Sequence, residues 1–169
     1  HILHSPMDRT ESPPTLRPLW PGLVFWLLAC FAAPVSASWA RPDAWYAALV
    51  KPAWNPPGWV FGPVWTTLYL LMGTAAWLVW RRGGWGAQRR PLSWFAAQLA
   101  LNALWTPLFF GFHRIDLALL EIVVLWAAIV ATIVAFARTS RAAAWLLAPY
   151  LAWVSFATFL TFTLWRLNS

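Results

Sequence analysis

The sequence predicts an all-α integral membrane protein, a bundle of five transmembrane helices with a structured first loop. Hydrophobic residues make up 61% of the 169 positions and charged residues only 10%, whereas soluble domains carry about 25% charged residues. Apolar stretches of about 20 residues, the length that crosses a bilayer, follow one another along the chain. None of them alternates with a period of two, as the strands of a membrane barrel would.

The chain opens with a polar, proline-rich stretch, residues 1–18, whose first methionine is Met7. We expect this stretch to be a disordered leader or upstream sequence, followed by a single membrane domain over 19–169. The first apolar stretch, 20–38, is the first predicted helix. Because arginines precede it and VSA at 35–37 resembles a signal-peptidase site, a cleaved signal peptide is an alternative for this stretch.

The remaining four predicted helices cover 59–80, 92–111, 116–137 and 142–165. The connection between the first two helices is the only long one, and long structured loops in compact bundles commonly form lids or binding loops. Its second half reads KPAWNPPGWVFGPVW (51–65), with four prolines and three tryptophans. Proline stiffens the backbone and the indoles favour contact with the bundle, so we predict that this loop is a lid.

The formal net charge of +7 comes from cations that stand between apolar runs, which is typical of membrane topology and argues against a nucleic-acid partner. The N-terminal stretch and the segments 81–90 and 138–141 share eight arginines: Arg9, Arg17, Arg81, Arg82, Arg89, Arg90, Arg138 and Arg141. The other side of a five-span topology holds four cations: Arg41, Lys51, Arg114 and Arg166. For a protein of a bacterial inner membrane this asymmetry predicts a cytoplasmic N-terminus and an external C-terminus.

Motifs for hydrolysis, phosphate binding or metal coordination are absent from the sequence. Cys30 is a lone cysteine in an apolar stretch, and His113 is the only histidine after the leader. Two axial haem ligands cannot be assembled convincingly from His113, Met72 and Cys30, so we predict no metal site. A tetrapyrrole bound here must be held by stacking and shape.

Aromatic and polar side chains recur at helical spacing on three of the predicted helices. Trp65, Tyr69 and Met72 share one face, as do Asn102 and Trp105. Tyr150, Trp153, Ala157 and Leu160 form a third stripe. Packing within the bundle and the wall of a pocket both explain these stripes.

Asn102 and Glu121 stand out among the polar residues within the predicted spans. An unpaired amide in a bilayer is costly, so Asn102 must bond a neighbouring helix, a ligand or an indole N–H. Glu121 is the one acidic residue deep in a span, which marks it as a functional candidate, although a structural polar contact is the favoured interpretation. Ala96 and Ala100 form a small-xxx-small pair that could mark close helix or subunit packing.

Three segments carry a family resemblance: WYAALVKPAWNPPGWVFGPVWTTLY (45–69), QLALNALWTPLFFG (98–111) and PYLAWVSFATFLTFTLWR (149–166). Over about 30–166 the chain resembles the tryptophan-rich sensory protein and translocator protein family (TspO/MBR, the peripheral-type benzodiazepine receptor family), as a bacterial member. The resemblance implies a five-helix membrane protein, often a homodimer, with a ligand cavity capped by the first loop. It implies that no cofactor is required. The ligands that it implies are porphyrins such as protoporphyrin IX, haem, or other lipophilic molecules.

The resemblance also implies roles for individual residues. Some bacterial members degrade protoporphyrin IX in light, and the two tryptophans implicated match Trp65 and Trp153, which are the candidate catalytic residues. The candidate ligand-binding residues share the lid or the aromatic stripes: Tyr46, Pro56, Pro57, Trp65, Tyr69, Asn102, Trp105, Phe109, Trp153, Phe156, Ala157 and Leu160.

Two positions depart from the animal members of the family. Phe162 stands where their sterol motif carries tyrosine, and Leu117 where they place a pocket tryptophan, and both departures weaken an inference of high-affinity sterol or drug binding. We expect a membrane receptor or sensor that binds porphyrins, with light-dependent degradation as an associated activity. The alternative is a transporter of porphyrins, sterols or other lipophilic ligands.

Overall fold

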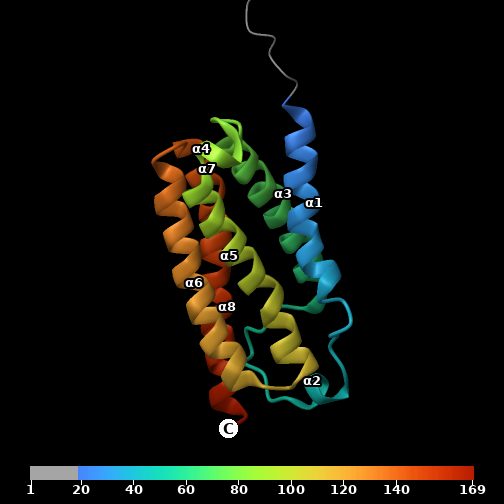
Figure 1. Cartoon of the computed structure of the whole chain (residues 1–169). Helices are drawn as coiled ribbons and strands as arrows, with labels where there is room; N and C mark the ends of the chain where they lie inside the picture. The colour runs from blue at the N-terminus through green and yellow to red at the C-terminus, as the bar shows by residue number, and fades with distance from the viewer. Residues whose placement is uncertain (1–18) are drawn as a thin grey trace, which may run out of the picture.

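The computed structural model describes residues 19–169, so the leader predicted for 1–18 lies outside the described residues. Within the described range the chain is helical and has no strand, which confirms the predicted class. The long helices run side by side: α1 (Trp20–Ser36), α3 (Phe61–Trp80), α5 (Arg89–Thr106), α6 (Ile115–Ala137) and α8 (Ala148–Leu167) (Figure 1).

By length and composition, α6 and the segment Arg141–Leu167 are able to cross a membrane, and α1 is a shorter apolar helix. Short elements connect the long helices: α2 (Ala44–Ala48), the 3-10 turn η1 (Gly58–Val60), α4 (Gly84–Ala87), the π-helical turn η2 (Pro107–Gly111) and α7 (Arg141–Leu146). Prolines mark two of the transitions. Pro107 begins η2 and Pro149 lies in the first turn of α8, where its missing N–H is tolerated.

The core forms where apolar stripes of the long helices meet. Its largest fully buried side chains include Tyr150, Phe95, Phe136 and Met72. Helix α1 approaches α3 closely at Gly73, where a Cβ atom would lie 2.6 Å from Leu27 Cδ2 and 3.1 Å from Leu27 Cα. Because backbone stands in the way, a side chain at this position would force the two helices apart.

The connection over residues 37–60, here called the lid segment, lies at the same end of the bundle as the C-terminus, opposite α4 and α7 (Figure 1). It is held to α8 by a reciprocal pair of bonds. Val50 N–H donates to Asn168 Oδ1 at 2.8 Å, and Asn168 Nδ2 donates to the Val50 carbonyl at 2.9 Å. Trp54 stacks on Phe159 of α8 at 5.3 Å between ring centroids. The segment is therefore attached to the C-terminal part of α8 at Val50 and Trp54.

Candidate functional site

A cavity of about 520 Å³ lies between the lid segment and the long helices. This volume is within the range typical of small-molecule sites. Its wall comes from the C-terminal end of α1, the lid segment, α3, α5, η2, α6 and α8. Trp65 of α3 and Trp153 of α8 both belong to it. The bundle thus encloses a ligand-sized space with aromatic walls.

Most of the residues that the sequence singled out for ligand binding line this cavity. They are Tyr46, Trp65, Tyr69, Asn102, Trp105, Phe109, Trp153, Ala157 and Leu160. Pro56, Pro57 and Phe156 are not among its lining residues. Phe156 instead lines a groove between α3 and α8, on the other side of Trp153, and is covered by Trp54 of the lid segment.

Part of the wall was not anticipated from the sequence. Ile122 and Leu125 of α6 line the cavity, as do Ala33 and Ala40 near the end of α1. The apolar period of α6 indicates that it has a buried face, but it does not show that this face meets a cavity. The alanines carry no sequence signal beyond their small size.

A chain of buried hydrogen bonds runs from the cavity wall into the core. Tyr69 donates its hydroxyl proton to Asn102 Oδ1 at 2.7 Å, and Asn102 Nδ2 donates to the Tyr150 hydroxyl at 2.9 Å. Tyr150 in turn donates to Gln98 Oε1 at 2.7 Å. The chain links α3, α5 and α8, and it satisfies the Asn102 amide through neighbouring helices, one of the outcomes that its mid-span position requires.

Several further buried polar groups have no hydrogen-bond partner among the described residues: Trp26 Nε1, Asn55 Oδ1, Gln98 Nε2, Trp105 Nε1 and both carboxyl oxygens of Glu121. Of these residues, Trp105 lines the cavity. Buried polar groups are nearly always bonded in folded proteins. The Trp105 indole N–H is therefore free to donate to a bound molecule.

The wall aromatics are held in place by one another. Trp105 stacks on Phe109 with centroids 4.9 Å apart and planes 16° apart. Trp65 lies 5.5 Å from Tyr69, and Trp153 meets Phe61 edge-on at 5.9 Å. Packing of this kind restricts rotamers, so the rings form a preformed surface.

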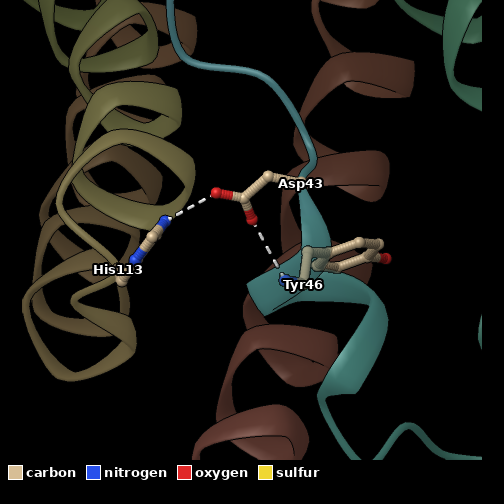
Figure 2. Close-up of polar contacts among 3 residues, drawn as sticks. All are labelled: Asp43, Tyr46 and His113. Atoms are coloured by element: carbon tan, nitrogen blue, oxygen red, sulfur yellow. Dashed lines mark hydrogen bonds and ion pairs between the residues drawn. The ribbon is translucent and has the colours of Figure 1, made fainter.

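The lid segment is joined to the turn between η2 and α6 by a polar cluster. Figure 2 shows the Asp43 carboxylate between two partners, the Tyr46 backbone N–H at 3.2 Å and His113 Nε2 at 3.0 Å. The His113 ring also stacks on Trp45, with centroids 4.3 Å apart. The Tyr46 N–H, followed by His113, lowers the pKa of Asp43 below its ordinary value. Asp43 is thus both the N-cap of α2 and a link to the bundle.

Cations near the lid segment differ in what they contact. Arg41 lines the cavity. Lys51 instead donates to the Tyr46 carbonyl at 2.7 Å, at the end of α2, and Arg114 pairs with Asp116 at 2.9 Å. Arg41 is therefore the cation best placed to meet an anionic group on a bound molecule.

The comparisons with known proteins agree with the sequence resemblance. The profile of the TspO/MBR family matches residues 23–166. The chain is 44% identical over 149 residues to a tryptophan-rich sensory protein of Cereibacter sphaeroides, covering 88% of this chain and 92% of that protein. It is 41% identical over 158 residues to the human translocator protein, covering 90% and 94%. It is 49% identical over 131 residues to the tryptophan-rich protein TspO of Chlorobaculum tepidum, covering 76% and 82%.

Proposed function

Because the chain belongs to the TspO/MBR family, we propose that it is a membrane receptor whose central cavity binds a porphyrin, protoporphyrin IX or haem. The names of its relatives, tryptophan-rich sensory protein and translocator protein, fit a protein that senses or handles such ligands. The observation that carries the proposal is the cavity itself, with Trp65 and Trp153 in its wall and Arg41 at the lid segment.

A porphyrin suits these walls for chemical reasons. Its flat macrocycle stacks on indole and phenol faces, and each stack contributes about 1 kcal/mol beyond the area it buries. Its propionates require a cation, which Arg41 supplies. Because the Tyr69 hydroxyl donates its one hydrogen bond to Asn102 Oδ1, its oxygen is left to accept from a pyrrole N–H. The unpartnered Trp105 N–H is left to donate.

We propose that the light-dependent degradation of protoporphyrin IX also takes place in this cavity. An indole is an oxidisable side chain, and Trp65 and Trp153 both line the space that the macrocycle would occupy. We propose that one of them donates an electron, or the hydrogen atom of its N–H, to the photo-excited porphyrin, so that the indole is oxidised to a radical and the porphyrin is reduced by one electron, in surroundings that largely exclude water.

The binding proposal is tested by the shift of the Soret absorbance when purified protein is titrated with protoporphyrin IX. Replacing both Trp65 and Trp153 by alanine removes two stacking faces, and we expect affinity to fall about tenfold or more. Trp145→Ala is the matched control, because Trp145 is 76% exposed on α7, away from the cavity. Equal affinity for the double variant and the control contradicts the proposal.

The photochemical part is tested separately by the rate of protoporphyrin IX loss under illumination. Trp65→Phe with Trp153→Phe keeps flat rings in the wall but removes the oxidisable indoles. At saturating porphyrin we expect this variant to retain binding and lose most of the light-dependent rate. Degradation as fast as in the unmodified protein would show that neither indole takes part.

The proposed receptor crosses the membrane with α1, α3, α5, α6 and α8, and the end that carries α4 and α7 faces the cytoplasm. Thiol labelling tests this in a Cys30→Ala background, with Ala87→Cys at one end and Ser38→Cys at the other; both positions are exposed. A membrane-impermeant maleimide should label only Ser38→Cys in intact inner-membrane spheroplasts. A homodimer remains an expectation, and Ala96 and Ala100 lie exposed on α5 for such a contact.

A further inference from the structure

The end of the bundle opposite the lid segment is strongly basic. Its six arginines, here called the arginine end, are Arg81, Arg82, Arg89, Arg90, Arg138 and Arg141. The acidic residues in the described part of the chain lie elsewhere. Asp43 is in the lid segment, and Asp116 and Glu121 are in the first turns of α6, whose other end leads to Arg138. The arginine end therefore has no carboxylate of its own chain to neutralise it within the described residues.

Hydrogen bonds join the turns that carry these arginines into one surface. Gln88 Nε2 donates to the Arg82 carbonyl at 2.9 Å, and the Thr139 hydroxyl donates to Gln88 Oε1 at 3.0 Å. Gln88 thus connects the α3–α5 link with the α6–α7 link. The segments that carry Arg82 and Arg138 are therefore joined at Gln88.

One pair of these arginines borders a shallow hollow. Arg89, Arg90, Ser93 and Trp94 line it at the start of α5. Neither arginine forms an ion pair within the described residues, and both are exposed. Cations in the first turn of a helix oppose its macrodipole, so Arg89 and Arg90 do not stabilise α5 itself. An anion in the hollow would offset this repulsion.

Tryptophans show at what depth the hollow lies. Trp85, Trp94 and Trp145 are 44%, 41% and 76% exposed on α4, α5 and α7, the elements that surround the arginine end. Exposed indoles gather at the boundary between lipid headgroups and acyl chains. The hollow therefore lies at headgroup level if the helices span the membrane as proposed above, a condition that is independent of porphyrin binding.

We propose that this hollow binds the headgroup of an anionic phospholipid. The guanidinium groups of Arg89 and Arg90 hold the phosphate, since their planar donor sets match its oxygens. Trp94 packs against the glycerol and upper acyl region of the same lipid. A soluble polyanion would meet the charges of the arginine end but would not use the apolar face of Trp94, which favours a lipid.

Thermal unfolding of the full chain in an uncharged detergent tests this proposal, with added phosphatidylglycerol or, for comparison, phosphatidylcholine. We expect phosphatidylglycerol to raise Tm by about 3 °C and phosphatidylcholine to leave it unchanged. Arg89→Gln with Arg90→Gln should lose most of that rise. Arg138→Gln with Arg141→Gln removes the same charge from the same end outside the hollow, and this control should keep most of it.

Two further measurements distinguish a lipid phosphate from a free phosphate ester and test the role of the Trp94 indole. Glycerol phosphate has the headgroup chemistry without acyl chains, and we expect it to give less than a third of the rise at equal concentration. Trp94→Ala should weaken the response to the lipid but not the response to glycerol phosphate. The proposal is overturned if the two double variants respond equally, if glycerol phosphate matches the lipid, or if phosphatidylcholine stabilises as strongly.

Discussion

At the lid end of the bundle each acidic side chain outside the core is paired, Asp43 with His113 and Asp116 with Arg114. At the arginine end, six guanidinium groups face no carboxylate within the described residues. The first end is held by short, directional contacts: ion pairs between side chains that are about half exposed, stacked rings and the Val50–Asn168 bonds. The second is governed by charge, which acts over about 10 Å and is screened by salt. Substitutions should therefore act on folding and lid closure at the first end, and on interaction with the surroundings at the second.

The largest effect on stability is expected from the buried hydrogen-bond chain that runs from the cavity wall into the core. Asn102→Leu removes the acceptor of the Tyr69 hydroxyl, which is then buried without a partner. We expect a loss of about 2 kcal/mol in the free energy of unfolding, measured by denaturant titration in detergent and independent of salt. Thr66→Val is the control, because Thr66 is exposed on α3 and bonds only its own helix. Equal stability of the two variants would mean that the chain adds nothing to the fold.

The next effect concerns the attachment of the lid segment to α8. Asn168→Ala removes both bonds to the Val50 backbone, which should weaken local closure by about 1 kcal/mol. We expect hydrogen exchange of the Val50 amide to accelerate about fivefold while amides of α6 are unchanged. Ser169→Ala is the control at the neighbouring position. Unchanged exchange at Val50 would show that the aromatic contacts alone hold the segment.

A smaller effect follows from the lowered pKa of Asp43. A carboxyl group whose pKa is lowered by folding stabilises the folded state fully above its unfolded-state pKa of about 3.9. This stabilisation is lost as pH falls through the folded-state pKa. Exchange of the Tyr46 amide, corrected for intrinsic rate, should therefore rise below about pH 4. In Asp43→Asn the side chain still caps α2 but does not titrate, so the rise in Tyr46 exchange at low pH should be absent. A rise of the same size in that variant would assign the pH dependence to another group.

The smallest effect is expected at the arginine end when no anionic lipid is present. In uncharged detergent, Arg89→Gln with Arg90→Gln should change the free energy of unfolding by less than about 0.5 kcal/mol, since exposed charges contribute little to folding. Denaturant titration alongside Asn102→Leu measures this directly. A loss comparable to that of Asn102→Leu would remove the contrast between the two ends.

Several features of the site could be predicted from residue spacing. The depth of Asn102 in an apolar stretch predicted a bond to a neighbouring helix, a ligand or an indole N–H, and the structure shows bonds to Tyr69 and Tyr150. Trp65, Tyr69 and Trp105 shared helical faces that now line the cavity. Periodicity succeeded here because the side-chain direction in a helix is fixed by its 3.6-residue repeat.

Other features required contacts that spacing does not encode. His113 stood out in the sequence only as a lone histidine, but in the structure it contacts Asp43 and Trp45 across about 70 residues of sequence. Phe156 was a candidate ligand-binding residue, but it lines the groove between α3 and α8 rather than the cavity. The connection between Val50 and Asn168 joins positions 118 apart, and no local pattern indicates such a pair.

The sequence by itself determined the helical class, the apolar character of the long helices, the charge asymmetry and the family, because composition and period are properties of each segment alone. Only the tertiary structure decided which of the marked side chains enclose the cavity, that Arg41 among the lid-side cations lines it, and that Gln88 gathers the arginines into one surface. These outcomes depend on how helices rotate and approach one another. Packing between distant segments sets that arrangement, and no local stretch of sequence encodes it.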